Sequence, residues 1–410
     1  MLLIDLPAVE ADPLWALREV YDADPRPGKL DLILGVYRDD DGVCPVMGAV
    51  RAAELRLARG TAANPGPASK EYRGLGGSEV FTRLLGDLVL GPDLAARAVG
   101  IQSVAGTGAL RMLSELIAVT GPGRTVLVGT PAYVNHVPIL TAAGLAVRTY
   151  PLVGGDGTLD VAATLDAIRH ARPGDVLLLQ GCCHNPTGLS LPADAWGDLA
   201  VALAAAGVVP FIDQAYYGLG DGLDADLAGM RRLLANVPEA VVAVSCSKAF
   251  GLYSERVGAA YVFARTPGEG AAARTLLEGI ARSSYSQPPG HGADVVAEVL
   301  GSPVLRSAWR DELESMRLRL ARLRAGLVAS VDSPAWRAMG GQRGMFLRLP
   351  LDAAQMAVLR DRAAVYGIPS GRINLAGIPE SRVAEVGAAI GSVHAEGAWA
   401  PSSGRVGAAS

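Results

Sequence analysis

Through the middle of the chain, short apolar runs alternate with longer segments whose apolar residues recur at helical spacing. Uninterrupted apolar runs are typical of strands buried on both faces of a parallel sheet. The pattern predicts strands at Thr125–Val128, Ala146–Tyr150, Val176–Gln180, Val208–Ile212, Val241–Ser245 and Ala259–Phe263. Helices are predicted at Gly108–Val119, Thr158–His170 and Ala193–Ala206, each bounded by glycine or proline. This alternation predicts a mostly parallel α/β sheet.

The pattern changes after about residue 300. A long charged helix is predicted from Trp309 to Leu327, followed by a different mixture of short strands and helices. We therefore expect a domain boundary near residue 300. The last residues, from Gly397 to Ser410, are small and polar, and we expect a flexible tail there.

Composition narrows the class of protein. Of 410 residues, 50% are apolar and 19% charged, which provides a large core and excludes disorder for most of the chain. The formal net charge of -4, without a basic cluster, argues against a nucleic-acid or membrane-surface partner. No apolar run reaches the roughly eighteen residues of a membrane span, and the N-terminus lacks signal-peptide features. Four cysteines (Cys44, Cys182, Cys183, Cys246) show no zinc or disulfide spacing, so we expect a soluble cytoplasmic protein with free thiols and no metal.

Lysine is rare in this chain. Among 37 basic residues, the lysines are Lys29, Lys70 and Lys248, and the rest are arginine. A compositional bias explains the general excess of arginine but not the retention of lysine directly after the apolar strand at Lys248. Lysine can lose its proton and act as a nucleophilic amine, whereas arginine cannot. Lys248 is therefore a candidate catalytic residue.

Polar clusters follow several predicted strands, at the edge of the sheet where ligands bind. Gly106 and Thr107 lead into a helix and suit a phosphate, although a plain helix cap is an equal alternative. Asn185 lies in an Asn-Pro turn that leaves its amide able to donate to a ligand oxygen. The alternative is a turn with no ligand-binding role. Asp213 ends a strand and suits a protonated ring nitrogen or, alternatively, a helix cap.

Lys248 has neighbours that suit the same chemistry. Ser245 and Ser247 flank it, and Arg256 follows eight residues later. Hydroxyl groups and a guanidinium suit a phosphate, and nearby positive charge favours the neutral, nucleophilic form of the amine. Further along, Arg282 and Arg372 have few acidic neighbours, so each is either a carboxylate-binding residue or an ordinary surface arginine.

Together these clusters resemble the aspartate/aromatic aminotransferase family, the class I, fold type I aminotransferases that depend on pyridoxal phosphate. The resemblance extends from Ala11-Asp12-Pro13 to the Gly371–Asn374 motif. It implies a large domain with a mostly parallel seven-stranded sheet and a smaller α+β domain. The expected division is an N-terminal arm and part of the small domain in 1–44, the large cofactor-binding domain in 45–300, the small domain in 301–396 and a tail in 397–410.

The resemblance also implies roles around the cofactor ring. Lys248 would form a Schiff base with pyridoxal phosphate and then move the proton that shifts during the reaction. Asp213 would pair with the ring nitrogen, with His136 and His184 behind it. The residues expected to complete the contacts to the ring and the substrate are Tyr133, Asn185 and Tyr216. Tyr216 is also expected to be a catalytic residue.

The phosphate and the substrate would be held by further residues. Tyr72 is expected to reach the phosphate of the neighbouring subunit, which implies a homodimer with shared active sites. Arg372 would bind the substrate α-carboxylate beside Gly35, and Arg282 of the other subunit would bind a distal carboxylate. The residues expected around the phosphate are Gly106, Thr107, Ser245, Ser247 and Arg256.

The resemblance implies an aminotransferase that moves an amino group between an L-amino acid, aspartate, glutamate or an aromatic one, and a 2-oxo acid in ping-pong fashion. Four positions depart from the family pattern: Tyr133 for tryptophan, Ala105 for serine, Gln287 for asparagine and Ile33 for glycine. They leave open a same-fold enzyme of specialised metabolism that catalyses elimination, replacement or carbon–carbon bond formation. A regulator built on this scaffold would need an additional DNA-binding domain, for which the chain has no spare length.

Overall fold

The computed structural model describes residues 12–60, 69–155 and 157–398, which form two compact units. Unit 1 contains the described residues up to Val43, Arg322–Gly340 and those from Met345 onward. Unit 2 contains the described residues from Cys44 to Ala321, with Gly341–Gly344. Helix α12 (Pro303–Ala329) contributes to both units, and the boundary expected near residue 300 precedes it. Ala11 and most of the expected tail lie outside the described residues.

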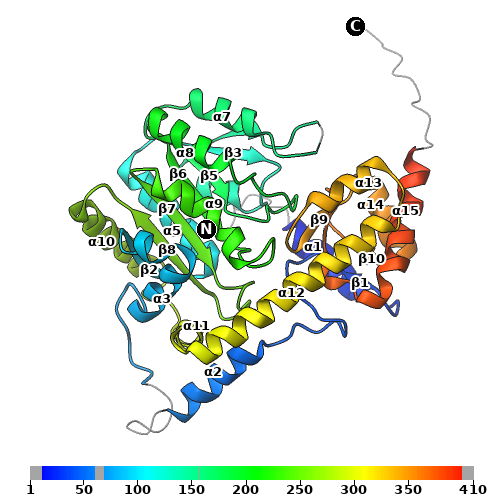
Figure 1. Ribbon diagram of the computed structural model, residues 1–410, viewed down its shortest axis with the longest axis horizontal. Helices are drawn as coiled ribbons and strands as arrows, with labels where there is room; N and C mark the ends of the chain where they lie inside the picture. The colour runs from blue at the N-terminus through cyan, green and yellow to red at the C-terminus, as the bar shows by residue number, and fades with distance from the viewer. Residues whose placement is uncertain (1–11, 61–68, 156, 399–410) are drawn as a thin grey trace, which may run out of the picture. The chain divides into compact units, whose positions relative to one another are not determined.

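Unit 2 is built on a seven-stranded sheet, with strand order β2-β8-β7-β6-β5-β3-β4 (Figure 1). Strand β8 is antiparallel to both of its neighbours, and the remaining pairs are parallel. The predicted α/β fold is thus confirmed. The strands are β2 (Ala98–Val104), β3 (Thr125–Thr130), β4 (Ala146–Pro151), β5 (Val176–Gln180), β6 (Val209–Gln214), β7 (Ala240–Ser245) and β8 (Val257–Phe263).

The central strands of this sheet, from β5 to β8 in the strand order, are buried on both faces, whereas most residues of the edge strand β4 are exposed. Alternate strand residues such as Phe211 and Val262 join a core with apolar residues of α5, α6 and α10. Tyr261 points to the opposite face, where its hydroxyl donates to the Thr82 carbonyl of α3 at 2.6 Å. Two-sided burial explains why the strands appear in the sequence as continuous apolar runs.

The helices of unit 2 begin and end at residues that commonly cap helices. Thr266 and Glu269, for example, form a capping box at the start of α10, and Gly207 ends α8 in a left-handed conformation. Besides α12 they are α2 (Gly48–Arg59), α3 (Glu79–Val89), α4 (Pro92–Ala95), α5 (Ala105–Thr120), α6 (His136–Ala142), α7 (Val161–Arg169), α8 (Ala195–Ala206), α9 (Leu223–Ala235), α10 (Pro267–Ser284) and α11 (His291–Gly301).

Unit 1 has two small sheets. Parallel strands β1 (Leu30–Asp31) and β10 (Val365–Tyr366) form one, and antiparallel strands β9 (Phe346–Arg348) and β11 (Arg372–Asn374) form the other. A core cluster with Ile33 lies beside β10. The helices of this unit are α1 (Pro13–Ala23), α13 (Pro334–Ala338), α14 (Ala353–Ala363) and α15 (Val383–Ala398).

The structure accounts for Lys29 in unit 1. Its Nζ donates to the carbonyls of Tyr21 at 2.5 Å and Asp24 at 2.7 Å, at the C-terminal end of α1. A cation there interacts favourably with the carbonyl groups at the end of the helix. Lys29 is thus a helix-capping residue. Of the helices in the described ranges, none is both long and apolar enough to cross a membrane.

Candidate active site

The polar clusters predicted from the sequence meet at one edge of the seven-stranded sheet. Strands β2, β3, β5, β6 and β7 end there, and the antiparallel β8 begins there directly after Arg256. They surround a cavity of about 230 Å³. The predicted residues that line it are Gly106, Thr107, Tyr133, Asn185, Asp213, Tyr216, Ser245, Ser247, Lys248 and Arg256, joined by Ala105, Leu110, Gln180 and Ala215.

One end of the cavity is the N-terminus of α5. The backbone N–H groups of the first helical turn have no partner inside a helix, and they carry partial positive charge. The hydroxyls of Ser245 and Ser247 and the guanidinium of Arg256 line the same cavity. A Cβ atom on Gly106 would lie 3.0 Å from Ser245 Cβ, so glycine allows this close approach. This set of donors suits a phosphate dianion.

Two residues at this end have left-handed backbone conformations. Ala105 has φ of 56° and Arg256 has φ of 54°. The N–H of Ala105 donates to the Arg256 carbonyl at 3.1 Å, which joins the two strained positions. Such conformations cost about 1–3 kcal/mol each and cluster at functional sites.

Lys248 presents its amine to the same cavity, with Nζ 5.2 Å from the centre of the Tyr216 ring. Burial lowers the pKa of Lys248 to about 8, and the Arg256 charge acts in the same direction while Asp213 opposes both. A larger fraction of this amine is therefore neutral at neutral pH than in an ordinary lysine, and the neutral form is the nucleophile.

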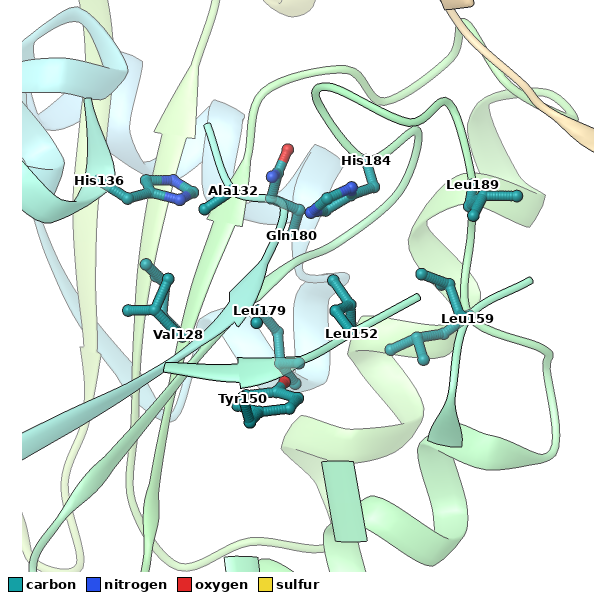
Figure 2. Close-up of a pocket in the computed structure, with 13 residues that line it drawn as sticks. Val128, Ala132, His136, Tyr150, Leu152, Leu159, Leu179, Gln180, His184 and Leu189 are labelled. Atoms are coloured by element: carbon teal, nitrogen blue, oxygen red, sulfur yellow. The ribbon is translucent and has the colours of Figure 1, made fainter. Parts of the chain in front are cut away.

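Asp213, at the end of β6, is held by a buried histidine. His136 Nε2 lies 2.9 Å from Asp213 Oδ2, and an ionised Asp213 requires this nitrogen to carry the proton and donate. Behind them is a cavity of about 30 Å³, roughly the space of one water, lined largely by leucines (Figure 2). His184 lies on its edge, where burial lowers the pKa of His184 to about 3, so this ring is neutral.

Asn185 and Tyr216 approach each other across the cavity, with Asn185 Nδ2 donating to the Tyr216 hydroxyl at 3.3 Å. Gln180 fixes Asn185 with two hydrogen bonds: its Oε1 accepts from the Asn185 N–H at 2.8 Å, and its Nε2 donates to the Asn185 carbonyl at 2.9 Å. Sequence reasoning missed Gln180. Its signal was its place as the last residue of a predicted strand.

Four residues predicted to contact the cofactor or the substrate directly do not line this cavity. Tyr72 is 93% exposed, and Arg282 is exposed and donates to Ser286 Oγ at 2.6 Å. Arg372 and Gly35 belong to unit 1, where both lie against Phe346. Arg372 is 3% exposed, and its Nη2 donates to the Ile33 carbonyl at 2.5 Å.

Comparison with known proteins identifies the family. The model of class I and II aminotransferases matches residues 27–390. The chain belongs to this family. The aminotransferase is 45% identical to the tyrosine aminotransferase of Rhizobium meliloti, over 92% of this chain and 96% of the relative. It is 36% identical to the aspartate aminotransferase of Escherichia coli, over 95% of this chain and 99% of the relative.

Solved structures agree with this assignment. An aromatic-amino-acid aminotransferase from Burkholderia pseudomallei, covalently bound to pyridoxal phosphate, has a TM-score of 0.90 and 34% identity, covering 96% of this chain and 99% of that chain. The aminotransferase is a pyridoxal-phosphate enzyme. Its cavity fits this cofactor, because groups able to donate to a phosphate, a carboxylate and a lysine with a lowered pKa line the same cavity.

Two of the four departures are explained by the structure. The Ile33 side chain packs into the core of unit 1 with Ala364, Tyr366 and Ile368. Gln287 accepts a hydrogen bond from the Arg73 N–H at 2.6 Å. The other two, Ala105 and Tyr133, line the cavity, and the Tyr133 ring meets His136 edge-on at 5.2 Å.

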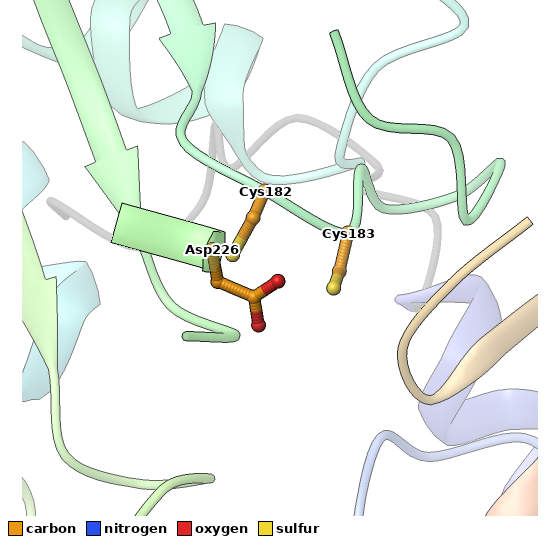
Figure 3. Close-up of side chains that lie close together, drawn as sticks. All are labelled: Cys182, Cys183 and Asp226. Atoms are coloured by element: carbon orange, nitrogen blue, oxygen red, sulfur yellow. The ribbon is translucent and has the colours of Figure 1, made fainter. Parts of the chain in front are cut away.

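One group of potential metal ligands lies elsewhere in unit 2, formed by Cys182, Cys183 and Asp226 (Figure 3). The Asp226 carboxylate accepts the backbone N–H groups of Gly218, Gly220 and Asp221 at 2.8–2.9 Å. Both thiols are buried. Asp226 therefore serves as the anchor of the loop that follows Tyr216.

Proposed function

We propose that this aminotransferase moves the amino group of aspartate or glutamate, and of aromatic amino acids, to a 2-oxo acid by a ping-pong mechanism. The observation that carries this proposal is the single cavity that joins the Lys248 amine, the Asp213 carboxylate and a phosphate-binding end. The named substrates of relatives support the substrate range, since these include tyrosine, aromatic amino acids and aspartate. The alternative, elimination or carbon–carbon bond formation, is not favoured by these relatives.

Bound pyridoxal phosphate would supply an aldehyde for the substrate amine and a ring that accepts the electron pair released at the substrate Cα. Lys248 Nζ would remove the proton from Cα, hold it and return it to the cofactor carbon that bears the amine. Asp213 would keep the ring nitrogen protonated, with the His136 N–H donating to its carboxylate. Asn185 Nδ2 and the Tyr216 hydroxyl, which lie 3.3 Å apart, would both donate to the ring oxygen.

We propose that Arg372 binds the α-carboxylate and that Arg282 binds a distal carboxylate. Arginine suits both roles because its planar group forms two parallel hydrogen bonds to a carboxylate. Arg282 is exposed and outside the cavity of its own chain, which supports a role in a second copy. The protein would then be a homodimer with shared active sites. The expected cytoplasmic location stays a prediction.

Replacing Arg282 tests the substrate range. Arg282→Ala should lower kcat/KM for aspartate by about 10²-fold or more, because a charge-assisted pair of hydrogen bonds is lost. For phenylalanine the decrease should be less than about threefold, because no distal carboxylate is present. Steady-state kinetics with both substrates measure the difference. Ser283→Ala, which alters the next exposed residue of α10, is the control, and equal losses for both substrates would remove the proposed role of Arg282.

A further inference from the structure

The residues from Tyr72 to Ser78, called the Tyr72 segment below, are bound to the rest of unit 2 at Arg73, the residue after Tyr72. The Arg73 N–H donates to Gln287 Oε1 at 2.6 Å. The Arg73 guanidinium binds both carboxylate oxygens of Asp294 in α11, at 2.7 and 2.6 Å. The Tyr72 ring itself is almost fully exposed, so packing of the ring contributes little to its position. The position of Tyr72 therefore depends on the backbone, which these contacts hold at the neighbouring residue, Arg73.

The loop that contains Gln287 also contacts Arg282, which lies in α10. The Arg282 guanidinium donates to Ser286 Oγ at 2.6 Å, and the Gln287 N–H donates to the Tyr285 carbonyl at 2.8 Å. Ser286 has φ of 68°, a conformation that turns the chain sharply after α10. One loop thus supports both residues that we assign to the second active site of a dimer.

The other end of the Tyr72 segment is anchored to the same loop. Gln102 Oε1 accepts from the Ser78 N–H at 3.0 Å, and Gln102 Nε2 donates to the Pro289 carbonyl at 2.7 Å. A Cβ atom on Gly77 would lie 2.8 Å from Pro288 Cγ, so the segment and the loop are in direct contact. Arg73 and Ser78 are therefore the two anchored residues of the Tyr72 segment, and Tyr72 directly precedes Arg73.

We propose that Gln287 and the Arg73–Asp294 ion pair are positioning groups, which place the Tyr72 hydroxyl for the cofactor phosphate of the other protomer. This inference rests on the role that the family resemblance implies for Tyr72, contact with the cofactor phosphate of the neighbouring subunit. Gln287 is not among the described residues that line the cavity of its own chain, so it acts through the Tyr72 segment. Its long side chain reaches the Arg73 backbone, which gives a physical reason for glutamine at this position.

The test is the rate at which the holoenzyme releases pyridoxal phosphate into cofactor-free buffer, followed by visible absorbance. Tyr72→Phe should accelerate release about tenfold, the effect of one hydrogen bond to a charged group. Gln287→Ala and Asp294→Asn should each accelerate it severalfold. Gln287→Glu, which keeps an acceptor oxygen at the same reach, should release the cofactor close to the wild-type rate. Combining Gln287→Ala with Tyr72→Phe should add nothing to Tyr72→Phe alone, because both act through one hydroxyl.

A matched control lies on the same helix. Glu298 of α11 pairs with Arg56 of α2 at 3.1 Å, as Asp294 pairs with Arg73, but Arg56 lies outside the segment that carries Tyr72. Glu298→Gln should leave the release rate unchanged. Equal acceleration by Glu298→Gln, or additive effects in the double variant, would assign Gln287 and Asp294 a structural role only. If Tyr72→Phe accelerates release but the Gln287 and Asp294 variants do not, the inference fails and the role of Tyr72 stands. If Tyr72→Phe itself has no effect, both fail.

Discussion

Lys248 lies between two charged residues with opposite effects on its amine. Arg256 and burial lower the pKa of Lys248, whereas Asp213 raises it, and the balance gives about 8. The amine is thus close to half neutral at slightly alkaline pH. A fully exposed lysine, with an ordinary pKa near about 10.4, would be almost entirely protonated under the same conditions.

This balance predicts the pH dependence of Schiff-base formation by the apoenzyme. With pyridoxal, which lacks the phosphate, the rate should rise with pH as the amine loses its proton and level off above pH 8 or so. Arg256→Gln should move the midpoint to higher pH, and Asp213→Asn should move it to lower pH. Stopped-flow absorbance measures both profiles. A midpoint near the ordinary lysine value, or shifts of both variants in one direction, would contradict the electrostatic account.

The sequence located Asn185, Asp213 and Lys248 because each follows a predicted strand. Strand ends meet at one edge of a parallel sheet, so Asn185, Asp213 and Lys248 could be placed together without coordinates. Gln180 ended a predicted strand, but this place did not show its role, since that role depends on hydrogen bonds to the Asn185 backbone across a turn. The left-handed conformation of Ala105 was equally hidden, because alanine rarely adopts it.

At the scale of elements, the phosphate-binding end depends on how closely α5 approaches strands β7 and β8. Gly258 lies in β8, opposite Ser103 of β2 and Ser245 of β7. A Cβ atom there would lie 2.5 Å from the Val244 carbonyl oxygen and 2.6 Å from the Ala105 carbonyl carbon. Both neighbours are backbone atoms, which cannot rotate away. A side chain at Gly258 would therefore push the start of α5 from the sheet.

We expect Gly258→Ala to destabilise the apoenzyme by about 3 kcal/mol or more, the upper range for overpacking a core. The matched control is Gly279→Ala in α10, where no atom lies within 4 Å of the new Cβ. That change should stabilise by up to about 1 kcal/mol, the difference in helix propensity. Urea unfolding followed by circular dichroism measures both. Similar effects from the two substitutions would contradict the close approach at Gly258.

Element prediction succeeded for the buried central strands, which are continuous apolar runs, and also for the mostly exposed edge strand β4. All six predicted strands are present, with ends shifted by a few residues. Strand β2 was missed because Gly100, Gln102 and Ser103 interrupt its apolar pattern. Gln102 is nevertheless fully buried, because its amide binds the Ser78 N–H and the Pro289 carbonyl. Hydrogen bonds between distant segments leave no periodic signal in the sequence.

At the scale of the whole molecule, each complete active site would need residues from two chains. Lys248 and the residues expected to bind the phosphate line the cavity of one chain, while Tyr72 and Arg282 are exposed on the surface of unit 2. In a homodimer with two-fold symmetry, each chain would give these residues to the other and receive the same in return.

Complementation between inactive chains tests this sharing. Lys248→Ala and Arg282→Ala homodimers should each transaminate aspartate poorly. A randomly mixed population should recover roughly a quarter of the wild-type activity, since half the dimers are mixed and each holds one intact site. Co-expression with two affinity tags isolates the mixed dimer, and its kinetics should show about half of the wild-type activity, because one of its two sites is intact. Mixed dimers as inactive as the parents would place Arg282 in its own chain's site or in none.

The most direct test of the central claim is a half-reaction with single amino acids and no 2-oxo acid. Holoenzyme is mixed with aspartate, glutamate or phenylalanine while absorbance is recorded and products are analysed by mass spectrometry. The account predicts one equivalent of 2-oxo acid per site and conversion of the cofactor to its pyridoxamine form, with no conversion in Lys248→Ala. Release of ammonia or a side-chain fragment without the pyridoxamine form would contradict transamination and favour the elimination alternative.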